Sequence, residues 1–210
     1  MQILYFADMF TGIIETIGSI ITIEQQETNK IFWLKSAISE ELKIDQSVAH
    51  NGVCLTVEEI KNGMHRVTAI QETLLKTNLN TWKINDPINL ERCVLLNGRM
   101  DGHFVQGHVD TTATCIQCEN QNGSWLYRFK LDEQFASLII EKGSISINGI
   151  SLTIFNVTQN EFSVAVIPYT FDHTNMQAIA KDSLANIEFD MVGKYIHRYM
   201  QLMNGKNCIQ

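Results

Sequence analysis

The stretch that decides the fold is Ser47-Val-Ala-His-Asn-Gly-Val-Cys-Leu-Thr-Val57, because the chain contains it twice. A closely similar stretch, Ser144-Ile-Ser-Ile-Asn-Gly-Ile-Ser-Leu-Thr-Ile154, follows 97 positions later. This offset holds without a gap from Ser47 to Glu91, and 12 of those 45 positions are identical. Self-similarity over such a length indicates a duplicated domain.

Each copy also begins with a related segment. Near the start of the copies the offset is 95, and it pairs Gly12-Ile-Ile-Glu15 with Gly107-His-Val-Asp110. We therefore divide the chain into an N-terminal extension, a first domain, a second domain and a C-terminal segment: residues 1–8, 9–97, 98–192 and 193–210.

The alternation of side chains within each copy is typical of β-strands. In residues 53–57, three apolar side chains alternate with Cys54 and Thr56, which is the pattern of a half-buried strand. Residues 65–70 and 162–167 are rich in β-forming side chains and follow turn signals. Many short strands at this spacing predict an all-β chain of two tandem antiparallel barrels with short helices.

One short helix is expected in each copy. The clearer one covers residues 132–143, where Asp132 can cap the N-terminus and Gly143 can end the helix. Its counterpart in the first copy is expected near residues 36–45.

A longer helix is expected after the second copy. Between Gly193 and Gly205, four apolar residues recur at the i, i+3, i+4 and i+7 positions of one helical face: Ile196, Tyr199, Met200 and Met203. A helix this short needs something on which to pack. The pattern fits packing on its own barrel and packing on other copies of the chain equally well.

The amino-acid composition of the chain limits the classes of molecule to which it can bind. The 16 basic and 23 acidic residues give a net charge of −7 without any basic run, which argues against a nucleic-acid or anionic membrane partner. No apolar stretch approaches the roughly 20 residues that span a bilayer. The first basic residue is Lys30, so the N-terminus lacks the charged region of a secretory signal. These features predict a soluble, cytoplasmic protein.

The cysteines do not form a recognisable framework. Five cysteines, an odd number, are scattered along the chain, unlike the pattern of a disulfide-rich domain. Cys115 and Cys118 form a lone Cys-x-x-Cys pair, and a zinc site would need further ligands that the sequence does not offer. We predict no metal site.

The two copies differ where side chains can carry chemistry. Cys54 stands where the second copy has Ser151, and His108 stands where the first copy has Ile13. Cys54 and Ser151 are each followed two residues later by a threonine on the same strand face, and such small polar pairs suit binding of a ligand. Because a thiolate is a nucleophile and imidazole titrates near neutrality, two alike sites could treat two alike ligands unequally. The sequence leaves open that Cys54 is only a small buried residue and His108 a structural histidine.

Seven motifs run through the chain in this order: Met9-Phe-Thr-Gly-Ile-Ile-Glu15, Ser47-Val-Ala-His-Asn-Gly-Val-Cys-Leu-Thr-Val57, Glu72-Thr-Leu74, Asn89-Leu-Glu-Arg92, Gly102-His-Phe-Val-Gln-Gly-His-Val-Asp110, Asn148-Gly-Ile-Ser-Leu-Thr153 and Lys194-Tyr195. Together they resemble the riboflavin synthase family, alpha chain, a group of lumazine-binding two-barrel proteins. The resemblance covers nearly all of residues 9–200.

The resemblance implies two six-stranded antiparallel Greek-key barrels and a C-terminal helix through which three copies assemble. It implies an active site between the first barrel of one subunit and the second barrel of a neighbour. The implied reaction is the dismutation of two 6,7-dimethyl-8-ribityllumazine molecules to riboflavin and 5-amino-6-(D-ribitylamino)uracil, the last step of riboflavin biosynthesis, without cofactor or metal. Two identical substrates that react unequally agree with a duplicated but asymmetric chain.

The resemblance also implies site residues. The catalytic positions fall on Cys54, Ser47, His108 and Asp190, with Cys54 or Ser47 as polariser or nucleophile and His108 as general base. The substrate-binding positions fall on Gly12, Ile13, Ile14, Cys54, Leu55, Thr56, Thr68, Ala69, Ile70, Gln71, Glu72, Thr73, Gly107, His108, Val109, Lys142, Ser151, Leu152, Thr153, Val166, Ile167, Pro168, Tyr169, Thr170 and Phe171.

At two positions the chain departs from the family pattern. Asp101 stands where a glycine is usual, which puts the geometry of that turn in doubt, and Tyr169 occupies a variable position.

A non-catalytic lumazine- or flavin-binding antenna protein is the alternative. Both Asn-Gly-x-(Cys/Ser)-Leu-Thr motifs and the Gly-His-Val-Asp motif are intact here, which favours the enzyme. A nicotinamide-dependent flavin reductase is a third possibility, and no Gly-x-Gly-x-x-Gly motif supports it.

Overall fold

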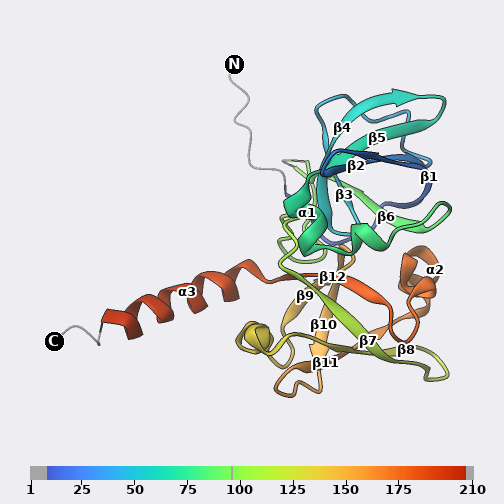
Figure 1. The fold of residues 1–210 in the computed structure, drawn as a ribbon. Coiled ribbons are helices and arrows are strands. Elements are labelled where there is room, and N and C mark those ends of the chain that lie inside the picture. The colour runs from blue at the N-terminus through green and yellow to red at the C-terminus, as the bar shows by residue number, and fades with distance from the viewer. Residues whose placement is uncertain (1–8, 96, 207–210) are drawn as a thin grey trace.

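The two copies fold into two closed antiparallel barrels, followed by one helix that extends away from both (Figure 1). The computed structural model describes residues 9–95 and 97–206. The expected extension, residues 1–8, lies outside this range, as does Cys208.

The first barrel closes in the order β1-β2-β5-β4-β3-β6. Strands β3, β4 and β5 follow one another as hairpins, and β6 returns to lie beside β3, which is Greek-key connectivity. Its strands are β1 (Thr16–Gln26), β2 (Asn29–Lys35), β3 (Ser47–His50), β4 (Val53–Lys61), β5 (Met64–Ala69) and β6 (Pro87–Arg92).

The second barrel repeats this topology, with β7 to β12 in the places of β1 to β6. Its strands are β7 (Thr111–Asn120), β8 (Trp125–Lys130), β9 (Ser144–Ile147), β10 (Ile150–Phe155), β11 (Glu161–Val166) and β12 (Leu184–Phe189). The predicted all-β fold of two tandem six-stranded barrels is confirmed.

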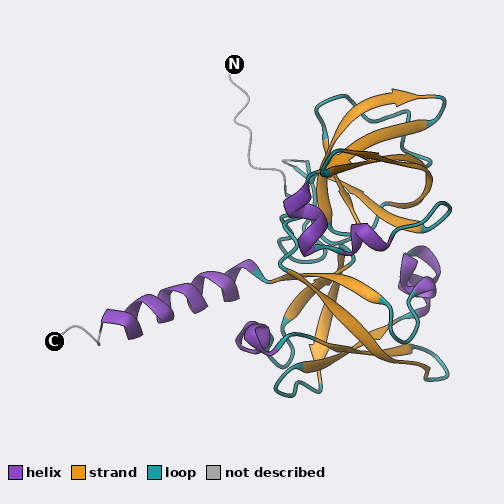
Figure 2. Cartoon of the chain, viewed as in Figure 1, coloured by secondary structure: helices purple, strands orange, loops and turns teal. Residues whose placement is uncertain are grey.

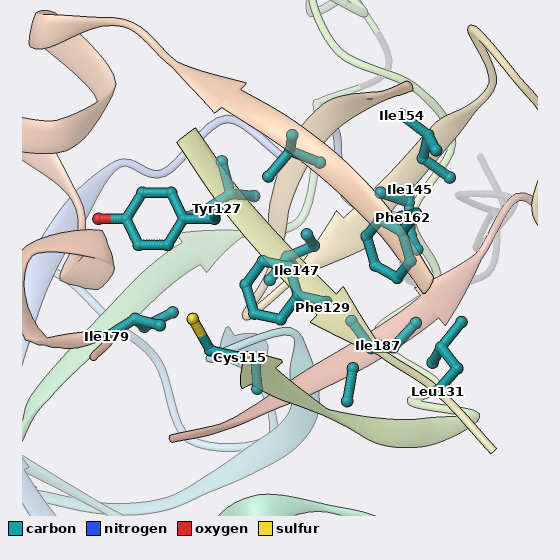
Figure 3. Close-up of a cluster of buried hydrophobic side chains, with 14 of the residues drawn as sticks. Cys115, Tyr127, Phe129, Leu131, Ile145, Ile147, Ile154, Phe162, Ile179 and Ile187 are labelled. Atoms are coloured by element: carbon teal, nitrogen blue, oxygen red, sulfur yellow. The ribbon is translucent and has the colours of Figure 1, made fainter. Parts of the chain in front are cut away.

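The alternation seen in the sequence fills each barrel with apolar side chains. Val53, Leu55 and Val57 of β4 are buried, whereas Thr56 between them is exposed. Figure 3 shows the core of the second barrel, where Phe129, Ile147 and Phe162 meet.

Short helices cover the barrel ends (Figure 2). They are α1 (Gln71–Lys76), η1 (Asn78–Thr81), η2 (Glu133–Leu138), α2 (Pro168–His173) and η3 (Asn175–Ala178). The sequence missed α1 and α2, because it continued the preceding strands through Ile70 and Ile167. These two residues are instead the extended N-caps of the helices.

Both helix predictions within the barrels need correction. Over residues 132–143 only the 3-10 helix η2 forms, with Asp132 accepting a bond from the Gln134 N–H as its cap. Ile139, with φ −111° and ψ 133°, is already extended and ends the helix four residues before Gly143. Residues 36–45 form no helix: the N–H groups of Ser39 and Glu41 donate to the carbonyls three residues before them, Ser36 and Ile38, which closes turns.

The two barrels meet through their Asn-Gly turns. Asn51 and Gly52 have φ angles of 48° and 77°, and Asn148 and Gly149 have 46° and 82°. A Cβ on Gly52 would lie 2.7 Å from the Gly149 nitrogen. Glycine is therefore required here both for the turn and for the close approach.

Asparagines surround this contact and join the barrels. The Asn89 amide donates to the Asn148 carbonyl at 2.9 Å, and the Asn186 amide donates to the Asn51 carbonyl at 2.9 Å. The network consists of three equivalent pairs: Asn51 and Asn148, Asn78 and Asn175, Asn89 and Asn186. Because each buried amide has partners, the network fixes one relative orientation of the barrels.

The C-terminal helix α3 (Met191–Lys206) confirms the expected helix and projects from the second barrel (Figure 1). Its apolar stripe does not pack on that barrel: Tyr199 is 64% exposed and Met200 is 58% exposed. Among the residues that the structure describes, no helix has both the length and the apolar character needed to cross a bilayer.

Candidate active site

The segments that lead into the two barrels cross over, so that each lies on the other barrel. The first leading segment is residues 10–15 and the second is residues 105–110. The carbonyl of Gly12 accepts the Ser151 N–H of the second barrel at 2.8 Å, and the carbonyl of Gly107 accepts the Cys54 N–H of the first at 2.9 Å. The two equivalent sites therefore each combine residues from both copies.

A pocket of about 640 Å³ opens where the second leading segment lies on the first barrel. Cys54 from β4 and Gly107 and His108 from the leading segment line it together. Its remaining wall comes from β4, from α1 and the residue after it, from the second leading segment, from η2 and from the base of α3: Val53, Glu72, Thr73, Lys76, Thr77, Gln106, Val109, Asp110, Gln134, Phe135 and Lys194.

Cys54 is half-buried and lies between this pocket and a small apolar cluster. The cluster consists of Phe10, Ala49 and Val105, which lie beneath the leading segments. Ser47 faces Thr56 across the β3–β4 ladder, and Ala49 faces Cys54. Ser47 and Cys54 are therefore diagonal neighbours on the outer face of the first barrel.

The equivalent position of the second barrel holds a different constellation. The Ser151 hydroxyl lies 2.7 Å from His103 Nδ1. Burial lowers the pKa of His103, and the nearby carboxylate of Asp190 opposes this effect. Asp190 itself accepts the Val192 N–H at 2.9 Å and so begins α3. A smaller hollow of about 390 Å³ runs along Ile13 and the rest of the first leading segment.

The chain matches the lumazine binding domain family twice, over residues 11–93 and 106–190. It is 38% identical over 193 residues to riboflavin synthase from Actinobacillus pleuropneumoniae, covering 91% of this chain and 90% of that one. It is 38% identical over 197 residues to riboflavin synthase from Bacillus subtilis, covering 93% and 92%. The riboflavin synthase of Schizosaccharomyces pombe is 36% identical over 196 residues, with 92% and 94% covered.

The chain belongs to the riboflavin synthase family.

Solved structures agree with this fold. LumP complexed with 6,7-dimethyl-8-(1'-D-ribityl) lumazine superposes with a TM-score of 0.78 at 20% identity, covering 86% of this chain and 98% of LumP. LumP complexed with riboflavin gives a TM-score of 0.80. At this identity the likeness extends to the two-barrel fold.

Several residues expected from the riboflavin synthase resemblance come together in the first pocket. Cys54, Glu72, Thr73, Gly107, His108 and Val109 all line it. Others have their side chains in the barrel cores, since Leu55 is 6% exposed and Ala69 and Val166 are fully buried. Only the backbone of these three residues can face a ligand.

Some of the other expected positions lie away from this pocket. The Thr68 hydroxyl donates to Glu58 at 2.8 Å, and the Lys142 ammonium lies over the Phe155 ring at 5.6 Å. Residues 167–171 form the start of α2, where Ile167 and Tyr169 are exposed and Phe171 stacks on Trp125 at 3.7 Å. Asp101, the departure from the family pattern, pairs with Arg99 at the surface.

The sequence reading missed three residues of this family's site region. His103 was quoted only as part of a motif, and its contact with Ser151 depends on the crossing of the segments. Glu91 and Glu188 are buried carboxylates that bind the leading segments. Their identity in both copies was a signal, because a charged residue repeated within an otherwise apolar strand needs a buried partner.

The Cys-x-x-Cys pair does not form part of a metal centre. Cys115 is buried in the second core and Cys118 is exposed, both on β7. Over residues 9–95 and 97–206, no group of three or more histidine, cysteine or acidic side chains is arranged to hold a metal ion.

Proposed function

We infer that the chain is a riboflavin synthase, which converts two molecules of 6,7-dimethyl-8-ribityllumazine into riboflavin and 5-amino-6-(D-ribitylamino)uracil. One lumazine transfers a four-carbon unit to the other. The two products together contain all the atoms of the two substrates, so the reaction needs no oxidant, reductant or water.

The observation that carries this proposal is the pair of crossed sites. One site joins Cys54 to the Gly107–His108 segment, and its equivalent joins Ser151 to the Gly12–Ile13 segment. Two copies of one ligand fit two copies of one site. Their different side chains allow one ligand to act as donor and the other as acceptor.

We propose that His108 removes a proton from the C7 methyl group of one lumazine. This proton is acidic because the resulting anion delocalises into the ring system, so a base that titrates near neutrality suffices. The second lumazine is electrophilic at its own C7. The side chain of Cys54 or Ser47 can add to this carbon as a nucleophile or polarise the ring there. Asp190 supplies the negative charge near the reacting pair. Its carboxylate acts on His103, where it opposes the lowering of the pKa by burial.

Holding the two rings against each other supplies much of the rate, because it makes a bimolecular step unimolecular. We propose that the two rings meet between the first barrel of one subunit and the second barrel of another, within a homotrimer. The exposed stripe of α3, with Tyr195 72% exposed and Tyr199 64% exposed, supports assembly through this helix. A surface helix normally buries such a stripe.

We further propose that the enzyme works in the cytoplasm, where reducing conditions keep thiols such as Cys54 and Cys93 unbridged.

Incubation of the purified protein with the lumazine alone tests the function. Riboflavin absorbance should rise while the lumazine disappears, with two lumazines consumed for each riboflavin formed. An increase in ligand fluorescence without consumption of lumazine would instead support a binding protein. Consumption of a nicotinamide would contradict both.

A further inference from the structure

Two buried carboxylates hold the two leading segments in place. Glu91 of β6 and Glu188 of β12 occupy equivalent positions in the two copies and are 5% and 2% exposed. Both lie on the outer faces of their barrels, where the leading segments cover them.

Each carboxylate uses both of its oxygens on backbone N–H groups of a leading segment. Glu188 Oε1 accepts the Gln106 N–H at 2.7 Å, and its Oε2 accepts the His108 N–H at 2.9 Å. Glu91 Oε1 accepts the Thr11 N–H at 2.6 Å, and its Oε2 accepts the Gly12 N–H at 3.0 Å. Charge-assisted bonds of this kind are the strong ones.

The glycine in each segment is held from the opposite side as well. The Gly107 carbonyl accepts the Cys54 N–H at 2.9 Å, and a Cβ on Gly107 would lie 2.6 Å from the Cys54 Cβ. Gly107 has a φ of 76°, a conformation that few other residues adopt. Glu188 and Cys54 therefore hold the Gly107–His108 peptide at both of its polar groups, Glu188 at the N–H and Cys54 at the carbonyl.

An ion pair anchors the end of the same segment. Asp110 accepts the Phe189 N–H at 2.9 Å and pairs with Lys194 at 3.0 Å. His108 thus lies between two anchored points, Glu188 and Asp110, and its backbone has little freedom to shift. Burial raises the pKa of Glu188, and the N–H bonds from Gln106 and the charge of Lys194 oppose this.

We propose that Glu188 is a positioning residue for the reaction: through the Gln106 and His108 N–H groups it holds the His108 imidazole against the pocket that Cys54 lines. Glu91 holds the first leading segment in the same way. That segment has Ile13 at the position of His108, which does not titrate, so Glu91 positions only the walls of the Ser151 site. The proposal rests on the function inferred above.

The matched variants Glu188→Gln and Glu91→Gln test this. Glutamine keeps the shape of the side chain, but its amide nitrogen cannot accept the second N–H bond. For Glu188→Gln, kcat should fall about 100-fold, since a displacement of about 1 Å costs this much, and the acid limb of the pH profile of kcat should shift. For Glu91→Gln, KM for the lumazine should rise about 10-fold while the pH profile of kcat stays unchanged.

Three further measurements separate positioning from a loss of folding. The NMR titration of the His108 imidazole should move in Glu188→Gln and stay in place in Glu91→Gln. Glu188→Asp, which keeps the charge with a shorter reach, should recover part of the lost kcat. In a His108→Ala background, Glu188→Gln should cost little further activity.

Equal losses of kcat in the two glutamine variants, with the His108 titration unmoved in both, would show that the carboxylates are only structural. Failure of the unaltered protein to form riboflavin would instead overturn the proposed function. The His108 titration would then still decide whether Glu188 positions the segment.

Discussion

The two barrels have the same strand order, the same register and matched contacts at their junction, yet their cores differ in kind. His50 and His65 are fully buried in the first barrel. The equivalent residues of the second barrel are Ile147 and Phe162, which pack among other apolar side chains of the core (Figure 3). A polar pair and an apolar pair therefore fill the same place in the same fold.

The histidine pair is tolerated because its hydrogen bonds run in one direction. The Val48 carbonyl can only accept, so His50 Nδ1–H donates to it at 2.9 Å. His50 Nε2 then accepts from His65 Nε2–H at 2.9 Å, and His65 Nδ1 accepts from the Ser39 hydroxyl at 2.9 Å. In this arrangement all four ring nitrogens have partners while both rings are neutral.

The shape of each barrel therefore depends on the alternation of buried and exposed side chains and on closure of the sheet. It does not depend on the chemistry of each core side chain. The Asn-Gly turns and the asparagine network are the same in both copies, because both barrels share one junction. Two of the differences between the copies bring in groups that can carry chemistry: Cys54 against Ser151, and His108 against Ile13.

The largest expected effect concerns α3, which only the second copy carries. A chain that ends at Arg198 loses the stripe residues Tyr199, Met200 and Met203 but keeps the Lys194 pair with Asp110 and the His197 contact with Ser137. It should sediment as a monomer and lose more than about 100-fold in riboflavin formation, because the two lumazines would no longer be held together. A chain ending at Lys206 is the control. A monomer of full activity would contradict the site between subunits.

Acid should unfold the first barrel before the second. The pKa of His50 is lowered to about 3 and that of His65 to about 4 in the folded chain, chiefly by burial, from an ordinary value of 6.5. The unfolded chain therefore binds protons at a higher pH than the folded chain does. The stability from the neutral pair is complete above pH 6.5 and is lost as the pH falls toward 3, with about 4 kcal/mol of it lost by pH 5.

Tryptophan fluorescence can follow this transition, since Trp33 and Trp82 are buried in the first barrel. Glu91 and Glu188 do not disturb the comparison. Burial raises the pKa of both carboxyl groups, and they lie at equivalent positions of the two barrels. Simultaneous loss of both barrels, unaffected by removal of the histidines, would refute the prediction.

A smaller effect is expected from exchanging the buried histidine pair of the first barrel for the apolar pair of the second. His50→Ile alone leaves the His65 Nε2–H without an acceptor and should cost about 2 kcal/mol in the free energy of unfolding. The double variant His50→Ile, His65→Phe installs the pair of the second barrel and should recover most of this loss. It should also remove the acid transition. Chemical denaturation gives both numbers, and additive losses would mean that the two histidines act independently.

The smallest effect is expected from making the sites alike. Cys54→Ser gives the first site the hydroxyl of the second and should lower kcat about 10-fold, because a hydroxyl is a weaker nucleophile than a thiolate. Cys54→Ala should depress turnover further while lumazine binding stays nearly intact. Steady-state kinetics and a binding titration check both variants, and an unchanged rate in Cys54→Ala would exclude a central role for the thiol.

Much of the fold could be predicted because short-range sequence patterns specify it. The repeat revealed two domains, and Val53, Leu55 and Val57 revealed which strand face is buried. The helix over 132–143 could not be predicted correctly, because Ile139, which fits the apolar face of a helix, is instead extended and buried in the core of the second barrel. α1 was missed because Ile70 suits a strand as well as it suits the extended residue before a helix.

The sequence by itself determined that one barrel occurs twice, which strand faces are buried, and that thiol and imidazole distinguish the copies. Only the tertiary structure decided which residues share a site. Gly107 lies on Cys54 and Gly12 on Ser151 because the leading segments cross between the barrels, and the buried carboxylates of Glu188 and Glu91 hold them there. The periodicity of apolar residues indicates which face of a strand is buried, but it does not indicate which distant segment covers the other face.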